Sequence, residues 1–136
     1  MRVYPMALAI LLLIGCNNKY RSASASDDLL NIQAMKVVEK DSDLVYQVRV
    51  FPRKEILDAD KTIARKMMYQ ADSSFYLIHK KLRVYPVSVE YIANGVANSF
   101  EYMVRFDQAN LPKEQALPLV YQDKYINQKN YQLLLK

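Results

Sequence analysis

The chain has 136 residues, 51% of them hydrophobic, and a formal net charge of +5. This length suits one small domain and is too short for two. A single cysteine, Cys16, and a single histidine, His79, exclude a disulfide and the common zinc sites, and two glycines exclude a glycine-rich phosphate loop.

The first sixteen residues have the pattern of an export signal. Arg2 precedes an apolar run over 6–14, and the small residue Gly15 precedes Cys16. A basic start, a short apolar core and a small residue before the cut are typical of a secretory signal peptide. The run is about half of the roughly 20 apolar residues that a transmembrane helix needs. An uncleaved helix and an ordinary cleaved signal with a chance cysteine remain the alternatives.

The motif Leu13-Ile14-Gly15-Cys16 resembles the lipobox of bacterial lipoproteins. The resemblance implies that a diacylglyceryl group is added to Sγ of Cys16, that residues 1–15 are removed, and that the new amino group is acylated. Two or more acyl chains anchor a protein stably to a membrane. In enteric bacteria a residue other than aspartate after the cysteine accompanies sorting to the outer membrane, and here that residue is Asn17. We therefore expect a lipid-anchored protein of the cell envelope, in the outer membrane.

The residues after Cys16 are small and polar without a period, which predicts a lipidated flexible tether over 16–28 and a single β-rich domain over 29–136. Loss of Arg2 with the signal peptide leaves a net charge of about +4. A mildly basic exported domain suits an anionic membrane surface or an acidic partner. Nucleic acid is not an expected partner.

Alternation of apolar and polar residues dominates the domain and predicts strands. The two clearest hairpin strands, over 85–91 and 100–106, flank Asn94-Gly95, a pair that favours a type I′ turn, so we expect an antiparallel hairpin over 82–106. On these strands Tyr85, Tyr91 and Tyr102 fall on the inward face. Further strands are predicted over 32–39, 44–51, 75–80, 117–121 and 131–135.

The segment 54–71 is the one candidate helix. Ile56, Ala59, Ile63 and Met67 lie close to one helical face, and neither glycine nor proline interrupts them. A strand over 64–71 that leads into Phe75 is the alternative.

These elements predict a mainly β fold, a small antiparallel β-sandwich with at most one helix. Leu117 to Asp123 resembles the Leu-x-Leu-x-Tyr-x-Asp strand of exported immunoglobulin-like domains, which a loop and a final edge strand follow. The Cys…Trp…Cys core of true immunoglobulin domains is absent, because the chain has no tryptophan. The alternative is an α+β fold with a helix at 54–71 on one sheet.

No catalytic or cofactor site is predicted. His79 lies beside two lysines without a recognisable nucleophile and acid. Asp41 with Asp43, and Asp58 with Asp60, lack the glycine that a calcium loop usually needs, so turn or capping roles are favoured. We expect a protein that is not an enzyme and needs no cofactor.

The predicted contact surface is a face of mixed apolar and basic residues, for which arginine and methionine are typical. Its members are Arg49, Phe51, Arg83, Met103 and Arg105.

Together these patterns suggest a binding or structural module that lipid on Cys16 attaches to the membrane and that contacts another envelope protein. By analogy of size and anchor, it could serve as an accessory subunit of a secretion, conjugation or transport assembly. One alternative is a surface binder of polysaccharide or host ligand, which predicts an exposed aromatic patch. Another is an enzyme with an unrecognised carboxylate site, which predicts acids with shifted pKa values in a pocket.

Overall fold

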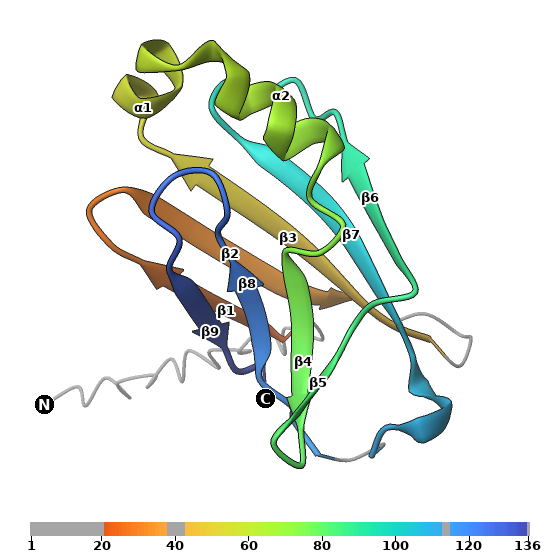
Figure 1. Ribbon diagram of the computed structural model, residues 1–136. Coiled ribbons are helices and arrows are strands. Elements are labelled where there is room, and N and C mark those ends of the chain that lie inside the picture. Colours follow the sequence, from red (N-terminus) through yellow and green to blue (C-terminus); the bar gives the residue numbers. More distant parts are fainter. Residues whose placement is uncertain (1–20, 38–42, 113–114, 136) are drawn as a thin grey trace, which may run out of the picture.

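Two antiparallel sheets face each other and form a small β-sandwich, which confirms the predicted mainly β fold (Figure 1). The computed structural model describes residues 21–37, 43–112 and 115–135. The elements are β1 (Ser22–Ser26), β2 (Leu30–Val37), β3 (Asp43–Pro52), α1 (Lys54–Ala59), α2 (Lys61–Tyr69), β4 (Phe75–His79), β5 (Leu82–Val84), β6 (Ser88–Ile92), β7 (Phe100–Asp107), the 3₁₀ turn η1 (Gln108–Asn110), β8 (Leu119–Gln122) and β9 (Asn130–Leu133).

The strand order is β1-β2-β3-β7-β6 in the larger sheet and β5-β4-β8-β9 in the smaller one. The alternating residues that the sequence placed on one face of β3 point inward, so Val48 and Val50 are fully buried. Across the core, the rings of Phe75 on β4 and Tyr102 on β7 lie 5.2 Å apart between centroids. The side chains between the sheets therefore form one continuous core.

The segment 54–71 forms two short helices, where at most one was expected. Asp60 separates them, because its backbone is extended and its side chain accepts a hydrogen bond from the Thr62 N–H. This is the geometry of an N-cap, which starts a new helix at Lys61. The helices cover one end of the sandwich (Figure 1). There the Tyr102 hydroxyl donates to the Met67 carbonyl at 2.6 Å and fixes the end of α2.

The predicted hairpin exists, since β6 and β7 pair with Tyr91 opposite Tyr102. The predicted type I′ turn at Asn94-Gly95 is wrong. The strands end at Ile92 and Phe100, and within the loop that joins them Gly95 has a positive φ whereas Asn94 does not. The Asn94 side chain instead accepts from the Val96 N–H, which forms a wider turn.

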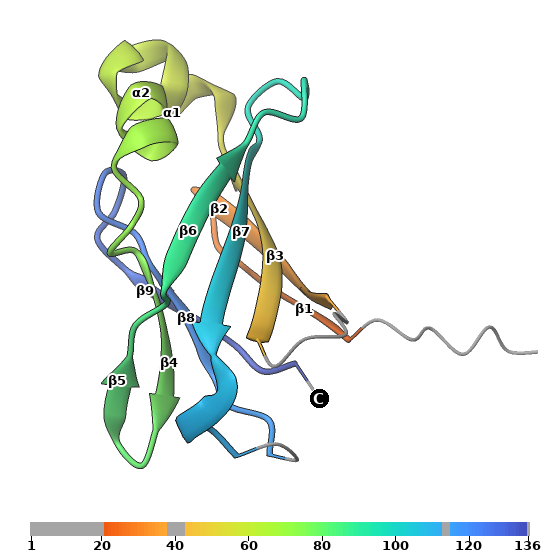
Figure 2. The same ribbon diagram turned by 90° about the vertical axis from the view of Figure 1, so that its right-hand side faces the viewer.

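Tyr85 is also placed wrongly by the alternation, because its side chain is 52% exposed. Residues 85–87 carry the chain from β5 in the smaller sheet to β6 in the larger one (Figure 2). A strand that changes sheets at Pro86 does not keep one inward face along its whole length.

Part of the predicted tether over 16–28 is a strand instead. Ser22–Ser26 forms the edge strand β1, which pairs with β2 along its full length. Ala23 and Ala25 pack against the core between exposed serines, so this short run has the alternation of a half-buried strand. Of the predicted tether, only residues 16–21 precede the sheet.

The motif that ends at Asp123 organises the loop between β8 and β9. The buried Asp123 carboxylate accepts hydrogen bonds from the backbone N–H groups of Ile126, Asn127 and Gln128. Beyond this loop, the Tyr131 hydroxyl donates to Asp27 in the turn after β1. The likeness to immunoglobulin-like domains stays a prediction.

Candidate functional site

The outward side of the larger sheet carries four of the five residues predicted as a contact surface. We call this surface the outer-sheet face. It comprises Ser22, Ser24, Gln33, Met35, Gln47, Arg49, Phe51, Glu101, Met103 and Arg105 from β1, β2, β3 and β7. Phe51, Arg49 and the facing β7 residues share this side because opposite residues in antiparallel strands point the same way.

Arg83 is not part of this face, which corrects the prediction. It lies on β5 in the smaller sheet, opposite Ile78. Its guanidinium lies over the Tyr76 ring, 4.5 Å from the centroid. A hydrogen bond with Tyr85 and the charge interaction with Tyr76 raise the pKa of Arg83 above its usual value. Arg83 therefore belongs to a separate surface.

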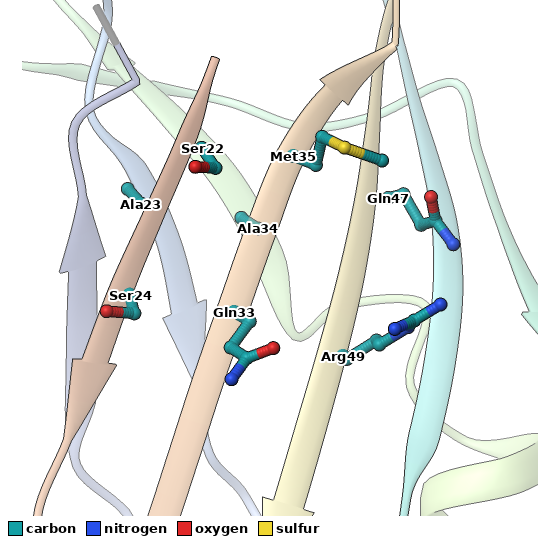
Figure 3. A pocket seen from close by; sticks show the side chains of 8 residues that line it. All are labelled: Ser22, Ala23, Ser24, Gln33, Ala34, Met35, Gln47 and Arg49. Carbon is teal, nitrogen blue, oxygen red and sulfur yellow. The ribbon is translucent and has the colours of Figure 1, made fainter. Parts of the chain in front are cut away.

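A hollow of about 460 Å³ lies on the β1–β3 side of the outer-sheet face. Figure 3 shows Gln33, Met35, Gln47 and Arg49 along β2 and β3, with Ser22 and Ser24 on β1 beside them. The serine side chains on β1 are short, whereas the side chains on β2 and β3 are long and extend further from the sheet. The difference in length leaves a hollow in the outer surface beside β1. The residues that line the hollow combine neutral hydrogen-bonding side chains with the apolar Ala23, Ala34 and Met35 and the cationic Arg49.

Glu101 anchors the centre of this face. It is only 4% exposed and lies directly opposite Arg49, whose Nε is 2.9 Å from Oε1 of Glu101. The Gln47 amide also donates to Glu101. Burial alone would raise the pKa of Glu101, but hydrogen bonds from Arg49 and Gln47 outweigh it and hold the pKa below its usual value.

The Arg49–Glu101 pair fixes a cation at the rim of the hollow. The contact uses Nε of Arg49, and the Arg49 side chain remains 48% exposed. The outer part of the guanidinium can therefore donate hydrogen bonds to a ligand. A second ion pair, from Arg105 to Asp43 at 3.4 Å, lies at the far end of β3.

The sequence prediction missed several residues of this face, among them Gln33, Gln47 and Glu101. The signal was present in part, because Asn31 and Gln33 alternate with the buried Leu30 and Ile32. The burial of Glu101 could not be predicted from alternation, because it depends on Arg49 and Gln47 of the neighbouring strand β3.

The residues that line the hollow include no carboxylate, and the adjacent Glu101 is held in an ion pair. Within residues 21–37, 43–112 and 115–135, no three histidine, cysteine or acidic side chains gather to hold a metal ion. The predicted lipid site Cys16 and the calcium candidate Asp41 lie outside the described residues.

Comparison with protein-family models, with curated proteins and with solved structures finds no match for this chain. Among the described residues, no helix has the length and apolar character needed to cross a bilayer.

Proposed function

We propose that this chain is a bacterial lipoprotein, held in the outer membrane of the cell envelope by lipid on Cys16. Its sandwich acts as a non-enzymatic module that binds another envelope protein through the outer-sheet face. The observation that carries the proposal is the position of β1. This strand begins at Ser22, six residues after the lipobox cysteine, and also forms one rim of the hollow.

The short connection supports a role close to the membrane. Six residues span at most about 20 Å when fully extended. Such a tether keeps the hollow near the bilayer and confines the domain to two dimensions, which raises its effective concentration toward membrane-bound partners.

The composition of the outer-sheet face supports a protein partner. Met35, Met103 and Arg49 are residue types that are enriched at protein interfaces. Ser22, Ser24 and Gln33 supply uncharged donors and acceptors, which suit the backbone of a partner segment. An accessory subunit of a secretion, conjugation or transport assembly would use a surface of this kind.

Site-specific crosslinking in the native host tests the proposal. A photoreactive residue replaces Gln33 or Gln47 on the outer-sheet face, and Gln132 on the outward side of the smaller sheet serves as the matched control. We expect one dominant protein partner from positions 33 and 47 and none from position 132. The partner should disappear with Cys16→Ala, and this variant should leave the membrane fraction.

Two results would overturn the proposal. Membrane retention of the Cys16→Ala protein would contradict the lipid anchor. Crosslinks that reach only polysaccharide, or that arise equally from Gln33 and Gln132, would contradict binding of a protein partner by the outer-sheet face.

A further inference from the structure

The turn between β4 and β5 has an unusual combination of sequence and backbone. His79 pairs with Leu82, so Lys80 and Lys81 are the two central residues of a tight hairpin. Both have positive φ, 50° and 64°. Two-residue turns of this type are dominated by asparagine, aspartate and glycine, because other side chains are strained there. Two lysines at such positions make the turn a candidate functional element.

Residues 79–83, the β4–β5 tip, combine positive charge with an exposed apolar side chain. Leu82 is 69% exposed and stands between the lysines and Arg83. Neither Lys80 nor Lys81 enters an ion pair within the described parts of the chain. The sequence has no acidic residue over 73–89. The positive charge of the tip is therefore not neutralised by its own strands.

The tip is held by its base. The Arg83 guanidinium stacks on the Tyr76 ring, and the Tyr85 ring lies 5.9 Å from that ring between centroids. Tyr76 is itself buried. This stack fixes the Arg83 cation on one face of β5, while the exposed Leu82 lies on the other face, because successive residues of a strand point in opposite directions.

The tip lies at the end of the sandwich opposite the helices (Figures 1 and 2). Strand β1 begins in the same half of the molecule as the β4–β5 turn. Under the proposed function, on which this inference rests, the lipid on Cys16 lies only five residues before Arg21. The end that carries the tip then faces the bilayer.

We propose that the β4–β5 tip contacts the membrane, with Leu82 among the lipid head groups and Lys80, Lys81 and Arg83 against anionic phosphates. Exposed apolar side chains and adjacent cations together favour an anionic lipid surface. The lipid anchor already holds the protein on the membrane. The tip therefore sets the orientation of the domain, and the outer-sheet face stands away from the lipid for its partner.

Fluorescence at the tip measures this contact. Cys16 is the only cysteine, so Leu82→Cys in the native lipidated protein introduces a single free thiol for an environment-sensitive label. The labelled protein is reconstituted into vesicles of phosphatidylcholine alone or mixed with phosphatidylglycerol, with a nitroxide quencher on the head groups. The matched control is Tyr69→Cys, because Tyr69 is 73% exposed on α2 at the opposite end. We expect quenching at position 82 in anionic vesicles and none at position 69.

Charge removal at the tip provides the second readout. Lys80→Asn/Lys81→Gly removes both lysines and supplies residues that suit the turn, so the hairpin is retained. Each cation near an anionic surface strengthens the attraction about fivefold. We therefore expect the ratio of membrane-bound to free tip to fall about thirtyfold in the double variant. Lys54→Gln/Lys61→Gln removes the same charge from the helices and should leave quenching unchanged.

The outcomes separate this inference from the proposed function. A protein that fails to float with phosphatidylcholine vesicles lacks the lipid anchor, which would contradict the proposed function. A protein that floats but shows equal quenching at positions 82 and 69, or quenching that Lys80→Asn/Lys81→Gly leaves intact, would overturn the tip proposal. So would photo-crosslinks from position 82 in cells that reach a protein and no lipid.

Discussion

Glu101, in the outer-sheet face, makes the stability of the folded protein depend on pH. Its pKa lies below the ordinary value of 4.5, so the folded state favours the ionised carboxylate. The resulting stability is fully present above pH 4.5 and is lost as the pH falls through the lower pKa of the folded state. We therefore expect the urea midpoint of the wild-type protein to decline below about pH 4.5.

Glu101→Gln tests this coupling, because it keeps the shape and removes the titration. The variant should be less stable at pH 7 by about 1–3 kcal/mol, since Arg49 and Gln47 lose a charged acceptor. Its stability should change less between pH 5 and pH 3. Asp27, whose pKa is also lowered by its hydrogen bond from Tyr131, titrates in the same range in both proteins. Parallel pH curves for the two proteins would show that Glu101 contributes nothing.

The β4–β5 turn stores strain in the backbones of Lys80 and Lys81, which both have a positive φ. A left-handed conformation costs a residue with a Cβ roughly 1–2 kcal/mol, whereas asparagine and glycine adopt it readily. Lys80→Asn/Lys81→Gly relieves this strain, but the glycine also increases the conformational entropy of the unfolded chain, which lowers stability. We therefore expect the free energy of unfolding to rise by a net amount of about 1–2 kcal/mol. Urea unfolding of the purified protein measures the change.

Gly95→Ala is the matched test in the opposite direction, because it should introduce the backbone strain that the double turn variant removes. Gly95 has φ +71°, and a Cβ built there meets nothing within 4 Å. Any loss therefore comes from the backbone alone and should be about 1 kcal/mol. A double turn variant that is no more stable than wild type, beside a destabilised Gly95→Ala, would show that the lysine turn is not strained.

The sequence predicted most strands because alternation depends on local burial. β3 and β7 have inward residues at every second position, and both were placed correctly. The type I′ turn was assigned to Asn94-Gly95, since composition favours it there, but the strand register puts it at Lys80-Lys81. The register of the strands depends on packing between strands that are distant in sequence. A local sequence pattern therefore cannot predict it. For the same reason β1, a run of serine and alanine, was taken for a tether.

The candidate site could be predicted only in part for a related reason. Arg49, Phe51, Met103 and Arg105 came together because β3 and β7 are neighbours, and their outward positions follow from alternation. Arg83 went to the other sheet, because the chain crosses between sheets at residues 85–87. Such a crossing is a property of the whole molecule. The Pro86 that accompanies it is equally compatible with an edge strand.

Side-chain contacts between the two sheets close the sandwich at the edge where β1 and β9 lie. β1 pairs with β2 alone, and β9 of the other sheet lies beside it. The Tyr131 hydroxyl donates to Asp27, while Asn127 donates to that hydroxyl at 2.6 Å and Lys129 lies 3.9 Å from Asp27. These contacts join the turn after β1 to β9 and so hold in place β1, which forms one rim of the hollow.

Tyr131→Phe should therefore loosen β1 more than the rest of the sandwich. The ring keeps its place beside Tyr121, at 6.3 Å between centroids, so the core is preserved. Loss of one hydrogen bond to a carboxylate costs about 1.5–3 kcal/mol. If this loss lowers only the free energy of local opening of β1, amide exchange in β1 becomes at least about tenfold faster. Hydrogen exchange by mass spectrometry should show this acceleration in peptides that cover Ser22–Ser26 and little change in β3 and β7. Equal acceleration in all strands would mean that the Asp27–Tyr131 contact supports global stability, and that β1 opens only when the whole domain unfolds.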